Sequence, residues 1–108
     1  MRLFSISKRF KQSLALVGTV WICSSTNEPE ASYYKLVFTN RDQVEGWIKF
    51  ENEKEEQYVF LAAYSKSKNI LHVKKQEEIF MAVLEENSFT ALIDDQKMTF
   101  KKQKSTAL

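Results

Sequence analysis

Few side chains in this chain of 108 residues could do chemistry, and they stand apart from one another along the sequence. His72 is the single histidine and Cys23 is the single cysteine. A zinc site takes several His or Cys ligands at set spacings, and a reactive thiolate needs a neighbouring base or cation. Neither residue has such neighbours in the sequence. We therefore predict no metal and no cofactor, and interpret His72 as a surface residue and Cys23 as a small buried hydrophobe.

Two pairs of adjacent carboxylates are the remaining candidates for acid–base chemistry. Asp94-Asp95 and Glu85-Glu86 both lie in short polar stretches between apolar runs. Asp in such a stretch hydrogen-bonds to its own backbone and favours a turn. The sequence also carries no Gly-rich phosphate loop, nucleophile elbow or zinc signature. These observations predict that the protein is not an enzyme.

The composition is that of one soluble globular domain. Apolar residues make up 44% of the chain, charged residues 28% and aromatic residues 13%. Such an aromatic content favours strands, because flat rings pack well on a pleated surface. The formal net charge of +2 is too small to indicate nucleic acid, and Lys and Glu alternate closely, as over residues 53–56. We therefore expect no nucleic-acid partner.

The segment 1–15 differs from the rest of the chain. Leu3, Ile6, Phe10 and Leu14 recur at spacings of three and four residues, and four basic residues lie among them. This pattern predicts a short amphipathic helix that leads into the first strand. A basic amphipathic helix can lie on an anionic membrane, but we favour a helix docked on the domain.

An apolar run over residues 14–23 follows these basic residues, as in a signal peptide. No small-x-small cleavage site follows at the usual distance, and Ile22 is larger than the residue that precedes the cysteine of a lipoprotein signal. The run is also shorter than the roughly 20 residues that a membrane-spanning helix needs. The chain as written is expected in the cytoplasm, with the cell envelope or secretion as alternatives.

From Tyr33 onward, apolar and polar residues alternate with period two, and polar clusters interrupt the alternation about every 8–12 residues, as in all-β domains. Eight short strands are predicted, over Val17–Ser25, Tyr33–Thr39, Val44–Glu51, Gln57–Tyr64, Asn69–Lys74, Glu78–Leu84, Ser88–Ile93 and Lys97–Lys101. The connections are too short for parallel crossovers, so the simplest arrangement is an antiparallel up-and-down meander. Closure into a barrel would remove its exposed edges. The predicted barrel spans residues 16–103, followed by a flexible tail over 104–108.

Motifs in three of these strands resemble those of small bacterial lipocalin-like domains, a calycin-type group in which many members are classed as lipoproteins of gut bacteria. The group's strands read Leu-x-Gly-Thr-x-Trp, Leu-x-Phe and Leu-Thr-Phe-x-Lys, and this chain has Leu16-Val17-Gly18-Thr19-Val20-Trp21, Leu36-Val37-Phe38 and Met98-Thr99-Phe100-Lys101. The resemblance covers about residues 16–102 and implies a lipocalin-like barrel, but no common biochemical activity. The chain departs from the group in having two glycines, where the group is rich in Gly and Thr.

If Trp21 faces the barrel interior, the alternation turns every second residue of each strand inward. Along the fourth strand it turns Tyr58 and Phe60 inward. An eight-stranded barrel has room for packed side chains or for one small ligand. Because the inward side chains are large, we expect a mostly packed interior with a small apolar cavity at one end. The candidate ligand-binding residues are Trp21, Tyr34, Phe38, Phe50, Tyr64, Phe80 and Phe100.

The same alternation places an apolar patch on the outside of the fourth, fifth and sixth strands. Its residues are Val59, Leu61, Ile70, His72, Ile79, Met81 and Val83. Monomers rarely expose a patch larger than a few hundred Å², so the N-terminal helix, a second copy or a partner protein should cover it. The leading hypothesis is a non-catalytic binding module that uses its cavity or its outer face. The alternative is a ligand-free structural or homodimeric β protein with the outer patch as interface.

Overall fold

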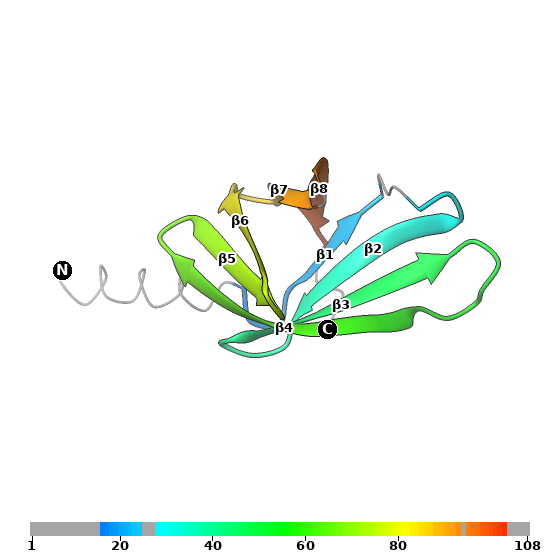
Figure 1. Cartoon of the computed structure of the whole chain (residues 1–108), viewed down its shortest axis with the longest axis horizontal. Helices are drawn as coiled ribbons and strands as arrows, with labels where there is room; N and C mark the ends of the chain where they lie inside the picture. The colour runs from blue at the N-terminus through cyan, green and yellow to red at the C-terminus, as the bar shows by residue number, and fades with distance from the viewer. Residues whose placement is uncertain (1–15, 25–27, 94, 104–108) are drawn as a thin grey trace.

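The computed structural model describes residues 16–24, 28–93 and 95–103, which form eight antiparallel strands closed into one barrel (Figure 1). The strands are β1 (Val20–Cys23), β2 (Ala31–Phe38), β3 (Gln43–Phe50), β4 (Gln57–Ser67), β5 (Ile70–Lys75), β6 (Glu78–Leu84), β7 (Ser88–Ile93) and β8 (Gln96–Lys102). Each strand pairs with its neighbours in sequence, and β1 pairs with β8. The predicted all-β up-and-down barrel is confirmed. The predicted N-terminal helix and C-terminal tail lie outside the described residues.

Strand β4 continues past the end predicted for it at Tyr64. Ser65, Lys66 and Ser67 pair with His72, Leu71 and Ile70 of β5, so this polar tract belongs to the ladder. The turn is reduced to Lys68 and Asn69, and Lys68 has a positive φ of 57°. Polar composition indicated a turn here, but the tract lies in the sheet because its backbone has a partner strand.

The start of β1 is held by a short chain of hydrogen bonds. Gly18 has a φ of +81°, which glycine adopts readily, and its N–H donates to the carbonyl of Phe38 at 2.7 Å. The Thr19 hydroxyl donates to the Leu16 carbonyl at 2.6 Å. The indole N–H of Trp21, a residue only 3% exposed, donates to the Thr19 hydroxyl oxygen at 2.8 Å. Thr19 therefore satisfies a polar group that the core would otherwise leave unpaired.

Aromatic rings around Trp21 pack the interior at this end of the barrel. The ring centroids of Trp21 and Phe89 are 5.0 Å apart, and Phe89 stacks on Phe100 at 5.1 Å. Phe38 meets Tyr64 edge to face at 4.8 Å. Cys23, Val44, Leu71 and Val73 fill the remaining space and are fully buried, as predicted for the inward set.

A bulge between β3 and β4 changes which residues of β4 face inward. Gly46 pairs with Phe60, but the next residue, Trp47, pairs with Tyr58, so Val59 is the extra residue. Tyr58 is 53% exposed and packs against Trp47 with ring centroids 5.4 Å apart. The prediction that Tyr58 faces the interior is therefore wrong, because the bulge reverses the alternation before Phe60.

Replacing Thr19 with valine should destabilise the barrel by about 1–3 kcal/mol, because the buried indole N–H of Trp21 loses its acceptor. Urea unfolding followed by circular dichroism measures the change. Thr90→Val is the matched control, since Thr90 is exposed and its hydroxyl forms a hydrogen bond with that of the exposed Thr99. Equal stability losses in the two variants would contradict this role for Thr19.

Candidate functional site

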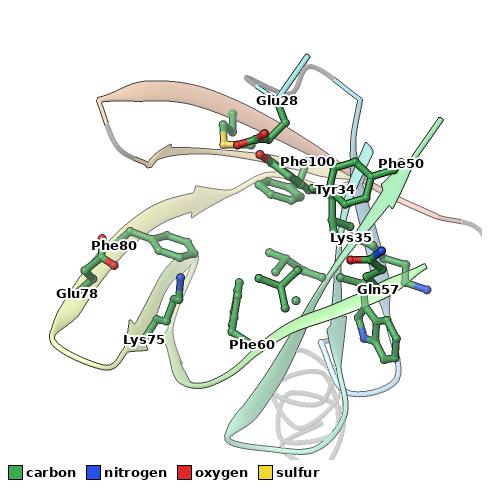
Figure 2. A pocket seen from close by; sticks show the side chains of 16 residues that line it. Glu28, Tyr34, Lys35, Phe50, Gln57, Phe60, Lys75, Glu78, Phe80 and Phe100 are labelled. Carbon is green, nitrogen blue, oxygen red and sulfur yellow. The ribbon is translucent and has the colours of Figure 1, made fainter. Parts of the chain in front are cut away.

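A cavity of about 470 Å³ lies at one end of the barrel. Successive strands run in opposite directions, so β3 and β5 end beside the cavity while β2, β4 and β6 begin there. We call this end of the barrel the open end. The opposite end, packed by Trp21 and Phe38, is the closed end. The apolar residues that line the cavity include Tyr34, Leu36, Ile48, Phe50, Val59, Phe60, Phe80, Met98 and Phe100. Figure 2 shows these side chains around an interior that they line without filling.

The floor of the cavity is Phe100, which rests on the packed rings of the closed end. Phe100 is 2% exposed and stacks on Phe89, which in turn contacts Trp21. The wall at β3 and β4 depends on Gly46. A Cβ at this position would lie 2.3 Å from the Phe60 ring, so only glycine leaves the ring its place in the cavity wall.

The structure brings four of the seven predicted ligand-binding residues together around this cavity, namely Tyr34, Phe50, Phe80 and Phe100. Trp21, Phe38 and Tyr64 face inward but pack in the closed half, away from the cavity lining. Tyr64 is also fixed there by its hydroxyl, which donates to the Asn40 carbonyl at 2.7 Å. The alternation identifies inward residues but does not tell which end of the barrel they fill.

Five charged or polar residues line the cavity as well, and the sequence reasoning missed them: Glu28, Lys35, Gln57, Lys75 and Glu78. Lys75 is the most informative. Its ammonium lies 5.0 Å from the centre of the Phe60 ring. In β5, Leu71 and Val73 are fully buried, and Lys75 is the next residue in this inward series. Continued alternation could have found it, but a lysine beside a turn resembles an ordinary surface residue.

One wall of the barrel beside this cavity is only partly paired. Between β6 and β7, the ladder joins only Ala82, Val83 and Leu84 to Ala91, Thr90 and Phe89. Within the described residues, the first half of β6, over 78–81, pairs with β5 but not with β7. The two strands meet near the turn that joins them and diverge toward the open end (Figure 1). The open end is thus both hollow and incompletely closed by hydrogen bonds.

A polar cluster braces the outside of the open end. Glu56, just before β4, accepts a hydrogen bond from the Tyr33 hydroxyl at 2.6 Å and forms an ion pair with Lys35. Lys35 also lies 5.5 Å from the centre of the Trp47 ring. The cluster ties the connection that precedes β4 to the outer face of β2 and β3.

This geometry shifts the ionisation of two groups in the cluster. Burial alone would raise the pKa of Glu56, but hydrogen bonds from Lys35 and Tyr33 and the charge of Lys35 outweigh burial and lower it. The hydrogen bond to Glu56, together with burial and the carboxylate charge, raises the pKa of Tyr33 to about 12. At neutral pH the cluster therefore contains an ionised Glu56 carboxylate and a protonated Tyr33 phenol.

Most of the predicted outer patch lies together on the outer face of β5 and β6. Ile79, Met81 and Val83 are 63%, 59% and 53% exposed. Their partners across the ladder are Lys74, His72 and Ile70, so two of the three pairs join predicted patch residues.

Three other residues lie apart from this row. Leu61 is exposed on β4, beyond the β4–β5 ladder. Val59, predicted for this patch, instead lines the cavity because it is the bulged residue. Leu92 on β7 is 58% exposed and was missed, although its place after the buried Ala91 could have indicated it.

Comparison with known proteins identifies no relative: no protein-family model matches the chain, and no curated protein or solved structure matches it. In the described part of the chain, no helix is long and apolar enough to cross a membrane. The same residues contain no group of three or more His, Cys, Asp or Glu side chains placed to hold a metal ion.

Replacing Glu56 with glutamine should lower the pKa of Tyr33 from about 12 toward its ordinary value of 10.0, because the strong hydrogen bond from the phenol to the carboxylate and the carboxylate charge are both removed. Ultraviolet titration of phenolate absorbance measures this, and Tyr33→Phe identifies the contribution of Tyr33 among the four tyrosines. An unchanged Tyr33 titration in E56Q would contradict the cluster.

The lowered pKa of Glu56 also makes the stability of the fold depend on pH. The contribution of Glu56 to the free energy of unfolding is present above its pKa in the unfolded chain and is lost as the pH falls through its pKa in the folded protein.

Proposed function

We propose that this chain is a non-catalytic binding protein that holds one small, mainly apolar molecule in the cavity at the open end. The observation that carries the proposal is the cavity of about 470 Å³ among aromatic and aliphatic side chains. Ligand sites commonly have volumes of about 300–1,000 Å³, apolar walls and a few polar groups. The resemblance of the Gly18-Thr19-Val20-Trp21 segment to lipocalin-like domains agrees with binding inside a barrel.

The distribution of packing supports this function over a purely structural role. Side chains of the closed half fill their space, and Phe38, Phe89 and Leu71 are essentially inaccessible to solvent. At the open end, Tyr34, Phe60 and Phe80 contact the core but remain partly exposed to the cavity. Partly exposed rings around a hollow gain further burial when an apolar molecule enters, and this gain favours binding.

A second ammonium placed inside the cavity, in addition to that of Lys75, should weaken binding of a neutral apolar molecule. We expect Phe80→Lys to weaken binding of the dye N-phenyl-naphthylamine at least about tenfold, because a desolvated ammonium opposes an apolar occupant. Fluorescence titration measures the affinity. Met81→Lys is the matched control, since Met81 is the next residue of β6 and is exposed on the outer wall. It should bind the dye as the parent protein does.

Val59→Lys repeats the test at a half-exposed lining residue, in case Phe80→Lys does not fold. Circular dichroism establishes folding of each variant before titration. No dye binding by the parent protein would refute the proposed function. Equal affinity of the parent, F80K and V59K proteins would place the dye outside the cavity and refute it as well.

The exposed apolar residues of β6 support a second candidate function, in which the outer face binds a second copy of the chain. Ile79, Met81 and Val83 lie in one row, with Ile70 and His72 beside them on β5. A shallow hollow on this face is lined by Ile70, Met81, Val83 and Thr90, among others, and could receive an apolar side chain. Such a row exceeds the scattered single hydrophobes of an ordinary monomer surface.

Light scattering coupled to size-exclusion chromatography tests this second candidate. If the outer face is a self-interface, the parent protein should be a dimer, and the double variant Met81→Lys with Val83→Lys should be a monomer, because buried unpaired charges oppose association. Phe80→Lys, on the inner face of the same strand, should leave the dimer intact. A monomeric parent protein at high concentration would rule out self-association through this face.

A further inference from the structure

Lys75 is a cation on the inner face of a largely apolar barrel. Along β5, the side chains of Leu71 and Val73 are completely buried, and Lys75 continues that inward row while Lys74 is exposed. Lys75 lines the cavity and keeps part of its surface accessible. Figure 2 shows its side chain extending from β5 into the interior, on the side of Phe60 and Phe80.

The ammonium of Lys75 has an aromatic neighbour but no carboxylate in contact. Its nitrogen lies 5.0 Å from the centre of the Phe60 ring. Glu78 is opposite Lys75 in the β5–β6 ladder, yet no Asp or Glu oxygen of the described residues lies within 4.0 Å of the Lys75 nitrogen. Figure 2 shows Glu78 at the edge of the cavity, with Lys75 nearer its middle. The positive charge is thus available to an anion that enters the cavity.

We infer that the molecule held in the cavity is an amphiphile with one anionic head group, which Lys75 binds, while the apolar tail lies among Phe60, Phe80 and Phe100. This inference rests on the proposed function of the cavity. A carboxylate would give the ammonium a charge-assisted hydrogen bond in surroundings where water competes less than in bulk. The apolar tail would cover rings that are partly exposed in the cavity.

The other charges on the lining limit the head group to a single negative charge. The lining set carries two carboxylates, Glu28 and Glu78, and two ammonium groups, but the ammonium of Lys35 already forms an ion pair with Glu56. A second negative charge on the head group would therefore meet further carboxylates and find no second unpaired cation among the described lining residues. A lone lysine also acts as a point charge and lacks the paired donors of arginine that suit a phosphate. A monocarboxylate with a flexible hydrocarbon tail fits these restrictions.

Isothermal titration calorimetry with octanoate, octanol and octylamine tests the inference, because the three molecules share one tail and differ in head-group charge. The full chain should bind octanoate about tenfold more tightly than octanol, and octylamine most weakly. Lys75→Met should remove the advantage of octanoate over octanol and leave octanol affinity unchanged or higher. Lys74→Met is the matched control, since Lys74 is the adjacent, exposed lysine, and it should behave as the parent protein.

The outcomes separate this inference from the proposed function. If the parent protein binds none of the three molecules, the proposed function of the cavity fails. If it binds octanol as tightly as octanoate, or octylamine most tightly, the cavity function stands and the anionic head group is refuted. Retained preference for octanoate in K75M, or equal loss of that preference in K75M and K74M, would also overturn the role of Lys75.

Discussion

The hydrogen-bonded packing of Trp21 at the closed end is the interaction on which the rest of the barrel depends. Thr19 accepts from the indole and donates to the Leu16 carbonyl, so this polar ring sits in the core at little cost. The Phe89 ring contacts the indole at a tilt and in turn stacks on Phe100, which lines the cavity. Each fully buried large apolar side chain contributes about 1.5–3 kcal/mol. Because one half of the barrel is packed in this way, the other half can stay hollow without unfolding.

Two backbone features of β3 and β4 turn the open half into a lined cavity. Gly46 has no Cβ, and the Phe60 ring occupies the space where one would lie. The bulge at Val59 then reverses the alternation, so that Tyr58 joins Trp47 outside while Val59 and Phe60 line the cavity. The Phe60 ring therefore lies against the barrel wall at Gly46. The side chains that line the hollow are large rather than small, so the hollow depends on where the backbone places them.

The sequence predicted the strands well because period-two alternation is a local property of the chain. It correctly turned Leu71 and Val73 inward and Met81 outward. It failed at Tyr58, because Tyr58, Val59 and Phe60 are three consecutive apolar residues and nothing in their types tells which one is the extra residue of a bulge. It also could not separate Phe38 from Phe80, since filling or lining the interior depends on what lies across the barrel. Lys75 was missed because its neighbours in sequence are polar, whereas its neighbours in space are aromatic.

The β5–β6 hairpin unites the features that matter for binding. On each strand, adjacent residues serve opposite faces: Lys75 and Phe80 line the cavity, while Lys74 and Met81 lie outside. The hairpin is joined to β4 through Ala63–Ser67, but its first residues on β6 have no ladder to β7 among the described residues. Local opening breaks few inter-strand hydrogen bonds where a ladder is short. The hairpin that carries the cavity's inner cation is therefore held on its β7 side by a short ladder of three residue pairs near the closed end, while its open end is bound only to β4.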